Sequence, residues 1–317
     1  MAQFVVRRLV QCLLVLLVMS FVIYNLIGLM PGDPIDIMIA SNPGATPEVV
    51  AHLRAIYGLD QPLMLRYWHW LIAALQGDFG FSRIHSQPVL EVLLPALLQT
   101  AKLLISSFVI SVVLAFVLGI LAALRPGGVV DGLVSLFAFA GISIPVFWLA
   151  LMFILIFAVN LHWFPASGIA NVGDGSVGDQ LRHLIMPIAT LALANTGGFT
   201  RYVRASMIET LRMDHVRTAR AKGAGPGRVV LIHAFRNALI PVVTVMGLNF
   251  GTLFGGALLT ETMFAQPGMG KMIYDSILGN DFNLALTGLL FATLVTLLSN
   301  LATDIAYGAL DPRIAVK

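Results

Sequence analysis

Long apolar runs without charged residues dominate the pattern of this chain. A helix needs about 20 apolar residues to cross the hydrocarbon core of a bilayer. The runs that qualify as membrane spans are Leu9–Met30, Leu103–Leu124, Leu133–Val159, Leu184–Thr200, Asn237–Thr260 and Phe282–Thr303. The fourth is the shortest and opens near Pro187, so its limits are the least defined. The pattern predicts an all-α integral membrane protein with six transmembrane helices.

The first run follows Arg7 and Arg8, as the apolar core of a secretory signal does. Signal cores are about 7–15 residues long and end in small residues. This run is longer and ends in Met30-Pro31-Gly32-Asp33-Pro34. Residues 1–30 are therefore predicted to be a retained transmembrane helix.

Residues 31–95 form a predicted extracytoplasmic helical segment. Thr46 can cap a helix that has Pro47 at its first position and Gly58 just past its end. A second helix is predicted from Pro62 to before Gly77. Its aromatic residues suit the membrane–water interface or, equally, the packing of a small core: Tyr67, Trp68 and Trp70.

Composition supports a membrane environment. Of 317 residues, 58% are hydrophobic and only 11% are charged, whereas soluble domains carry about 25% charged residues. Cys12 is the single cysteine, so a disulfide framework or a thiolate metal cluster is not expected.

The basic residues predict the orientation. With the amino terminus inside, the inner segments hold 13 of the 19 Lys and Arg residues but only 5 of the 16 acids. Cytoplasmic loops are enriched in Lys and Arg, so both termini are predicted to be cytoplasmic. The remaining chain divides into a core of five helices at residues 96–310 and a cytoplasmic tail at residues 311–317.

The six spans contain no Asp, Glu, Lys, Arg or His. Coupling to protons through carboxylates is therefore not expected, although sodium coordination by backbone carbonyls stays open. Polar residues in the spans are candidates for a translocation path: Ser143, Asn195 and Asn249. A phosphate-binding loop ends in Gly-Lys followed by Ser or Thr, and the only Gly-Lys pair, at Lys271, is followed by Met272. ATP hydrolysis is expected to come from another polypeptide.

The inner segment from Arg201 to Arg236 holds eight basic residues and two acids. Asp214 lies where a short helix through Lys222 is predicted to start. The glycine-rich stretch 223–227 must break that helix, and a new helix is predicted from Arg228 into the fifth span. Small residues at Ala219 and Gly223 would let another surface come close. The alternative is a basic loop that contacts anionic lipid.

A series of short motifs runs along nearly the whole chain: Arg7-Arg8 with Pro31–Pro34, Tyr57–Pro62, Gly77–Ser82, Thr218–Gly223 with His233–Pro241, Thr260–Thr262 with Pro267–Lys271, and Asp311–Arg313. Together they resemble the permeases of dipeptide, oligopeptide and nickel ABC importers. One departure is that Arg217, Thr218 and Ala219 stand where the broader permease superfamily has Glu-Ala-Ala.

The resemblance implies a type I ABC importer permease fold in a bacterial cytoplasmic membrane. Implied partners are a second homologous permease, two ATP-binding subunits that use ATP and Mg²⁺, an extracytoplasmic solute-binding protein and membrane lipids, with no nucleic acid. The chain itself would bind no cofactor and would not be an enzyme. The implied ATPase-coupling residues are Arg217, Thr218, Ala219, Arg220, Ala221, Lys222 and Gly223.

The implied solute is a dipeptide, an oligopeptide or a similar small molecule, and nickel, a metal–chelator complex and glutathione are the alternatives within the same machinery. Two other classes compare less well with the sequence. An intramembrane enzyme built on Ser143 needs a general base, yet all seven histidines lie outside the spans. A passive channel would leave the basic segment at 201–236 without a role.

Overall fold

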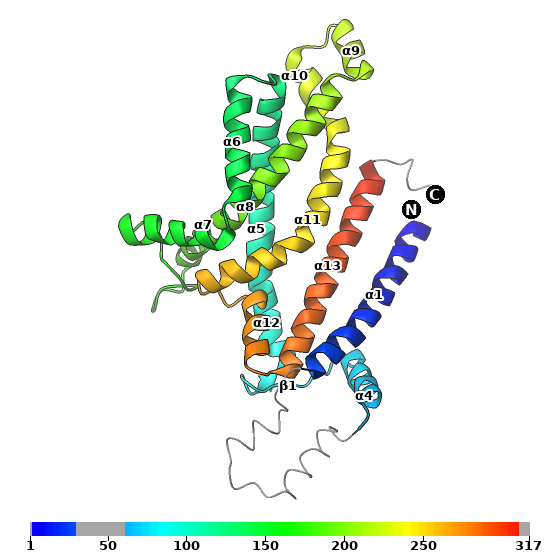
Figure 1. The fold of residues 1–317 in the computed structure, drawn as a ribbon, viewed down its shortest axis with the longest axis vertical. Helices are drawn as coiled ribbons and strands as arrows, with labels where there is room; N and C mark the ends of the chain where they lie inside the picture. The colour runs from blue at the N-terminus through cyan, green and yellow to red at the C-terminus, as the bar shows by residue number, and fades with distance from the viewer. Residues whose placement is uncertain (1, 30–60, 311–317) are drawn as a thin grey trace, which may run out of the picture. The chain divides into compact units, whose positions relative to one another are not determined.

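The computed structural model describes residues 2–29 and 61–310, and helices account for most of them. The helices are α1 (Ala2–Gly28), α4 (Leu63–Leu75), α5 (Val89–Leu124), α6 (Val129–Ser143), α7 (Val146–Phe153), η1 (Ile154–Asn160), α8 (Val177–Leu211), α9 (Asp214–Ala221), α10 (Pro226–Arg228), η2 (Val229–Ala234), α11 (Phe235–Met263), α12 (Met269–Leu278) and α13 (Phe282–Leu310). Two short strands, β1 (Phe81–Ser82) and β2 (Gln87–Pro88), pair in antiparallel fashion. Figure 1 labels most of these elements.

The chain forms two compact units that interleave along the sequence. One unit holds residues 1–9, 98–271 and 295–317, and the other holds residues 10–97 and 272–294. The division of the chain at residues 30, 95 and 310 stays a prediction.

Four helices in the described part are long and apolar enough to cross a membrane: Gln3–Gly28, Val89–Leu124, Pro226–Gly251 and Phe282–Ala306. A bent pair, Val129–Ser143 with Val146–Asn160, adds a fifth if it forms one span. The predicted fourth span lies within α8, which is not among them. The predicted all-α membrane class is confirmed, and the count of six is compatible with four or five apolar spans plus α8.

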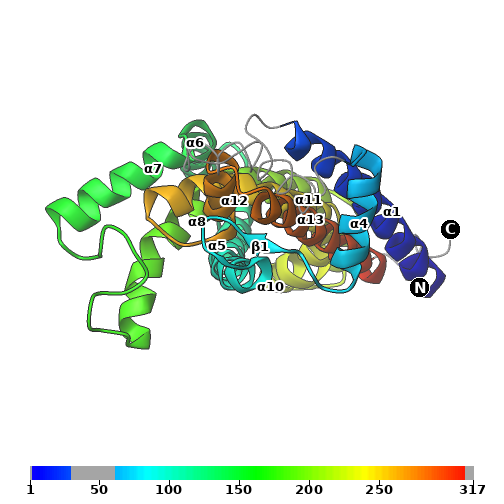
Figure 2. The ribbon, with the colours of Figure 1, turned by 90° about the horizontal axis from the view of Figure 1, so that it is seen from below.

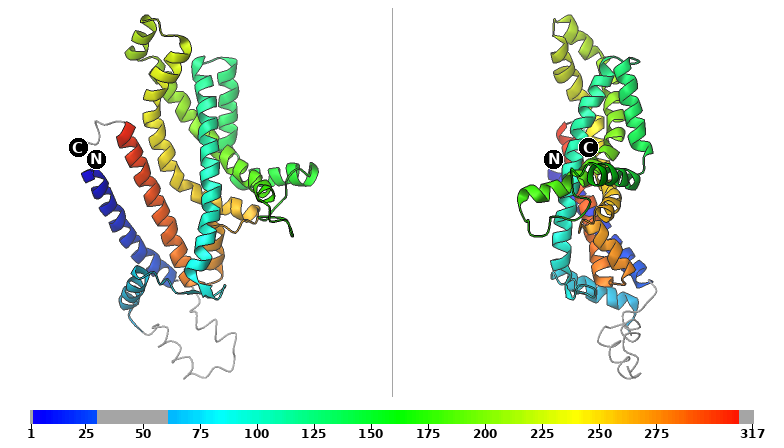
Figure 3. Two further views of the ribbon diagram at one scale, coloured as in Figure 1. Left: turned by 180° about the vertical axis from the view of Figure 1, so that it is seen from behind. Right: turned by 90° about the vertical axis from the view of Figure 1, so that its left-hand side faces the viewer.

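The predicted third span, Leu133–Val159, is not one straight helix. Its two halves meet at an angle of 102°, and α7 leaves the direction of α6 in Figures 1 and 3. The break falls at Pro145, and the preceding residue, Ile144, is extended (φ −84°, ψ 123°). A proline disfavours the helical conformation of the residue before it, so the uninterrupted apolar run concealed a break.

The helix α8 is surrounded by protein, which explains why its sequence is less apolar than that of a lipid-facing span. It packs against α6, α7 and α11, and its buried residues include Thr190, Thr196 and Thr200. At Gly197 a side chain would overlap the backbone of Ala138 on α6. Small and hydroxyl-bearing residues at such positions let helices approach closely in a membrane.

The amino-terminal end of α8 is fixed by polar caps. The Ser176 hydroxyl accepts a hydrogen bond from the Asp179 N–H at 3.2 Å, and the Asp174 carboxylate accepts one from the Ser176 N–H at 3.0 Å. The latter bond holds the pKa of the exposed Asp174 carboxyl below its usual value. These caps place the start of α8 well before the predicted span.

Outside the spans, the structure confirms one predicted helix and contains elements that were not predicted. The predicted helix after Pro62 is confirmed as α4. The strand pair and α12 were not predicted. In the unit that holds the strands, Asp281 accepts hydrogen bonds from the Ser82 hydroxyl at 2.5 Å and the Ile84 N–H at 3.0 Å. The predicted helix between Thr46 and Gly58, and the motifs at residues 31–34 and 311–313, lie outside the described residues.

Candidate functional site

The basic segment folds into the predicted helix, break and second helix. The short helix α9 starts at Asp214, as predicted. The Asp214 carboxylate lies in its first turn and interacts favourably with the positive end of the helix dipole. After the break, Pro226 begins the next helix, two residues before the predicted Arg228, and this helix continues through η2 into α11. The segment thus joins α8 directly to α11.

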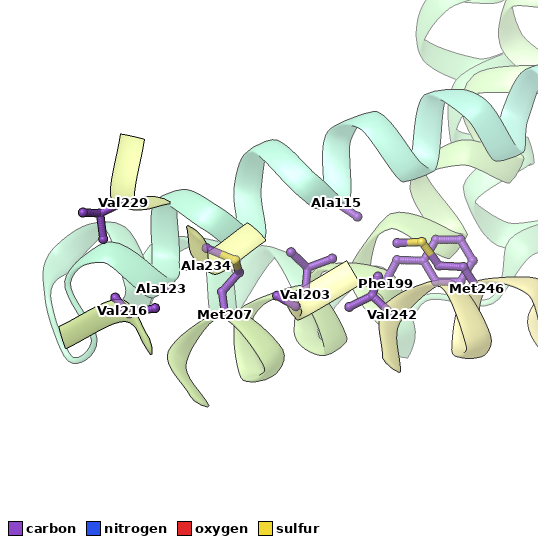
Figure 4. Packing of buried hydrophobic residues seen from close by; sticks show 11 residues of the cluster. Ala115, Ala123, Phe199, Val203, Met207, Val216, Val229, Ala234, Val242 and Met246 are labelled. Carbon is purple, nitrogen blue, oxygen red and sulfur yellow. The ribbon is translucent and has the colours of Figure 1, made fainter. Parts of the chain in front are cut away.

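The helix α9 is fixed to the ends of both long helices. His215 Nε2 lies 3.3 Å from the carbonyl oxygen of His233 and 3.2 Å from the side-chain amide of Asn237. Val216 is fully buried in a cluster that draws on α5, α8, η2 and α11 (Figure 4). Members of this cluster, here called the anchor cluster, are Ala115, Ala123, Phe199, Val203, Met207, Val216, Val229, Ala234, Ala238, Val242 and Met246. A displacement of α9 would therefore move the ends of α8 and α11 together.

The predicted coupling residues divide between two faces of α9. Ala219 is buried within its own chain, so its small side chain serves internal packing, and its role in coupling to an ATPase stays a prediction. The others are exposed and form the outward basic face: Arg217, Thr218, Arg220, Ala221, Lys222 and Gly223. Arg217 also lies 3.6 Å from Asp214 in an exposed ion pair.

Gly223 is required by the backbone. Its φ is +81°, a conformation that costs other residues about 1–2 kcal/mol. The Gly223 N–H bonds to the carbonyl of Arg220 at 2.9 Å, and the Ala224 N–H bonds to that of Ala219 at 3.1 Å. These two bonds are the Schellman ending of a helix. The helix ending thus gives a local reason for glycine at position 223, and the close approach of a partner there stays a prediction.

The three candidates for the translocation path lie on three different helices. Ser143 is exposed at the last residue of α6. The side-chain amide of Asn195 on α8 donates to the carbonyl of Leu191 at 2.7 Å, and that of Asn249 on α11 donates to Val245 at 2.7 Å. Both asparagines thus bond back to their own helices and are partly exposed. Their role in solute passage stays a prediction.

A charged pair between α6 and α8 was missed by sequence reasoning. Arg204 donates two hydrogen bonds to Asp131, at 2.5 and 2.7 Å, and Asp131 also accepts one from the Gly127 N–H at 2.8 Å. The carboxylate is almost fully buried, whereas the Arg204 side chain is 32% exposed. Nearby, the Arg201 guanidinium lies 5.2 Å from the centre of the Phe139 ring. Asp131 and Arg204 each lie next to a charge-free run, at its predicted cytoplasmic end. This position was the only indication of the pair in the sequence.

A second missed site surrounds Glu261 at the end of α11. Its fully buried carboxylate accepts hydrogen bonds from the Thr100 hydroxyl at 2.5 Å and the Lys271 N–H at 2.9 Å. The Met269 N–H in turn donates to the Thr100 oxygen at 2.7 Å. A side chain at Gly268 would overlap the carboxylate. In this arrangement, here called the Glu261 cradle, the motif at 267–271 encloses the buried carboxylate that the motif at 260–262 supplies.

Gln266 extends the Glu261 cradle to two further segments. Its side-chain oxygen accepts from the Gln99 amide at 2.6 Å, and its own amide donates to the carbonyl of Gly168 at 2.7 Å. The Gly168 N–H donates to the carbonyl of Phe264 at 2.9 Å. The turn between α11 and α12 is therefore tied both to α5 and to the loop that precedes α8.

Comparisons with known proteins agree with this architecture. The chain is 34% identical over 316 residues to the oligopeptide transport system permease protein of Bacillus subtilis, covering 99% of each chain. It is 37% identical over 317 residues to the glutathione transport system permease protein of Escherichia coli, covering 100% of each. A solved structure of the MetNI methionine ABC transporter, in inward-facing conformations, matches with a TM-score of 0.58 and 20% identity over 70% of this chain and 97% of that one.

A solved amino acid ABC transporter matches with a TM-score of 0.52 and 12% identity, over 68% of this chain and 93% of that chain. At such identities these two structures establish the fold, and they confirm the predicted permease fold. The model of the binding-protein-dependent transport system inner membrane component matches residues 115–316. The corresponding amino-terminal model matches residues 1–115. The chain therefore belongs to the family of inner membrane components of binding-protein-dependent transport systems.

Proposed function

We propose that this permease forms half of the solute pathway of an ATP-driven importer of peptides, with a second permease as the other half. The observation that carries the proposal is the attachment of α9. This short helix exposes a basic face and is packed through the anchor cluster onto α8 and α11, the helices that hold Asn195 and Asn249. A helix so placed can transmit movement from an ATPase to the membrane-embedded residues.

The proposed mechanism uses partner subunits for the chemistry. Two ATP-binding subunits bind ATP and Mg²⁺, and their closure displaces α9. Because Val216 is packed into the anchor cluster, the displacement moves the cytoplasmic ends of α8 and α11. The bonds between Arg204 and Asp131 pass the movement of α8 to α6. Alternating exposure of the residues between these helices then releases, on the inner side, a solute delivered by a binding protein on the outer side.

A peptide-like solute is supported by the names of the full-length relatives. The B. subtilis relative is named for oligopeptides, and the E. coli relative for glutathione, itself a small peptide. Nickel or a metal–chelator complex is the alternative within the same machinery. Identifying the molecule that co-purifies with the binding protein distinguishes these solutes: a bound peptide supports the proposal, and a bound metal ion or chelate contradicts it.

Reconstitution in lipid vesicles tests whether the partner subunits, and not this chain, hydrolyse ATP. The purified chain alone is expected to hydrolyse no ATP above background, because its sequence has no phosphate-binding loop. Adding the ATP-binding subunits, the second permease and peptide-loaded binding protein should produce hydrolysis that peptide stimulates, together with peptide uptake. Hydrolysis by the chain alone would contradict the proposal, as would full coupling after removal of α9.

A further inference from the structure

The helix α4 carries an exposed apolar stripe that the transport proposal does not use. Met64, Trp68, Ile72 and Leu75 follow one another at helical spacing and are 65%, 56%, 41% and 81% exposed. We propose that α4 lies in the membrane–water interface at the Gly28 end of α1, and that this stripe binds the acyl chains of phospholipids. The inference does not depend on which solute the protein carries.

The opposite face of α4 is held against α1 by aromatic side chains. The Tyr67 ring lies edge-on to Phe21, with centroids 5.2 Å apart, and to Tyr24, with centroids 5.5 Å apart. Its hydroxyl lies 2.8 Å from that of Ser20. Trp70 stacks on Tyr67 at 6.1 Å. These contacts direct one face of α4 towards α1, and Figure 2 shows the two helices side by side. The stripe residues take no part in these contacts and are exposed.

The contacts with α1 also determine the depth of α4. A hydrocarbon core of about 30 Å corresponds to about 20 helical residues, which is the interval from Leu9 to Gly28. Leu63, at the start of α4, packs against Gly28. The deepest contact is Ser20, eight residues from Gly28, or about 12 Å along the helix. The helix axis therefore lies near one edge of the hydrocarbon core, where interfacial helices bury their apolar faces about 5–10 Å deep.

Lipid fits the stripe better than water or another protein surface. Leu26 and Leu29, at the same end of α1, are 60% and 78% exposed, as expected of the apolar surface that a membrane-spanning helix presents to lipid. His69 follows Trp68 in the sequence and is exposed on the helix surface, and interfacial helices combine such a polar edge with an apolar face. Trp68 has the amphipathic ring that is enriched at this depth.

Tryptophan fluorescence in vesicles tests the placement. The full-length chain, assembled with its partner subunits, is reconstituted in phosphatidylcholine and phosphatidylglycerol, with phosphatidylcholine brominated either near the carbonyl end or near the methyl end of its chains. Trp68→Phe should remove part of the fluorescence that bromine quenches, and more of it with bromine near the carbonyl end. Trp70→Phe, on the packed face of the same helix, is the matched control and should remove less.

A second measurement avoids any change to the aromatic cluster. A nitroxide attached to Met64→Cys, in a Cys12→Ser chain, should collide more often with oxygen dissolved in lipid than with a water-soluble nickel chelate. The proposal is overturned if the nickel chelate is preferred, because the stripe then faces water. It is also overturned if both reagents reach Met64→Cys in the isolated chain and neither does in the assembled complex, because a protein partner then covers the stripe. Equal quenching losses for Trp68→Phe and Trp70→Phe would likewise contradict it.

Discussion

Gly268 and Gly223 show two different reasons for a glycine. At Gly268 the space is filled by the Glu261 carboxylate, so any side chain would displace it. At Gly223 the surroundings are open, and only the positive φ requires glycine. Glycine at 268 therefore leaves room for a buried carboxylate, whereas glycine at 223 permits the end of a helix.

Glu261→Gln should destabilise the permease without a change in side-chain size. One of the two acceptor oxygens is then lost, and the NH₂ group that replaces it faces a donor, either the Thr100 hydroxyl or the Lys271 N–H. A buried donor left without a partner costs about 1–3 kcal/mol. The measurement is the melting temperature of the purified protein in detergent. Glu209→Gln, at an exposed position on α8, is the control and should stay within about 0.5 kcal/mol. Equal melting temperatures for both variants would show that the Glu261 cradle does not need the charge.

Gly223→Leu and Gly223→Asn separate backbone conformation from close approach to an ATPase. Asparagine adopts positive φ more readily than leucine. Gly223→Leu should weaken the end of α9 by about 1–2 kcal/mol, which lowers its ratio of folded to unfolded forms roughly 5- to 30-fold, and ATPase association should fall with it. Gly223→Asn should retain association. Co-purification of the ATPase, normalised to the membrane level of each variant, is the measurement, with Arg228→Gln as the charge control. If Gly223→Asn also loses association, the need for glycine is explained by close approach of the ATPase and not by the backbone conformation.

Sequence reasoning at this scale succeeded where a residue acts locally. Asp214 at the start of α9 and Pro62 at the start of α4 were predictable because capping depends on neighbours in the chain. The burial of Ala219 and the different environments of Trp68 and Trp70 depend on packing against distant segments. The same holds for the Asp131–Arg204 pair, whose partners lie 73 residues apart. The sequence places each partner beside a charge-free run, but it does not show that the two meet.

Among the helices, α8 links the candidate sites. Its 35 residues extend about 52 Å at 1.5 Å per residue, which exceeds the thickness of a hydrocarbon core. It carries Asn195 near its middle, Arg204 further along and the anchor cluster at its end. A rigid helix of this length can move all three sites together.

Breaking the Asp131–Arg204 pair should have unequal effects from its two sides. Arg204→Ala leaves a nearly buried carboxylate without its cation and should cost about 1.5–3 kcal/mol, the range for hydrogen bonds to charged groups. Asp131→Ala leaves a partly exposed guanidinium that water can reach, so its cost should be lower. Melting temperature and peptide-stimulated ATP hydrolysis are the measurements.

The double variant, Asp131→Ala with Arg204→Ala, serves as the control for this pair. It should recover part of the stability lost in Arg204→Ala, because no charge remains unpaired. If the two single variants lose the same stability and the double variant loses their sum, the pair makes no coupled contribution.

Helix boundaries illustrate what apolar runs predict well and poorly. Runs predicted α1, α5, α11 and α13, because each of these spans is a continuous helix. The same method missed the break at Pro145, because both sides of it are apolar. It missed the start of α5 at Val89, because Lys102 interrupts the charge-free run and Pro95 lies inside the helix. It missed the polar ends of α8, because such ends resemble loops in composition. The helix α12 is amphipathic and short, so its pattern gave too little signal to distinguish it from a loop.

For the molecule as a whole, the testable expectation is the path of the chain across the membrane. Reporters fused after Asp174 or Asp275 should lie outside, and those after Arg125 or Arg220 inside, because basic residues gather in the predicted inner segments. Fusions after Pro34 and Lys317 extend the test to parts that the structure does not describe, outside and inside respectively.

The decisive pairs of fusions flank the bent helices and α8. The helix α6 alone has 15 residues, or about 22 Å, which is too short to cross the core. The chain must therefore use α7 and η1 to reach the outer side at Asp174. Arg125 and Asp174 fusions reporting the same side would show that the bent pair does not cross, and Asp174 and Arg220 fusions reporting the same side would remove α8 as a span.

The Glu261 cradle also has a consequence for biosynthesis. Thr100 leaves the ribosome 161 residues before its partner Glu261, and Gln99 leaves 167 residues before Gln266. Since chains are made from the amino terminus, both polar groups of α5 enter the membrane region long before their acceptors exist. The nascent permease must therefore hold them in a provisional environment, with water, lipid headgroups or an insertion chaperone as their first partners. A chain interrupted before residue 261 would never form the hydrogen bonds between Thr100 and Glu261 or between Gln99 and Gln266.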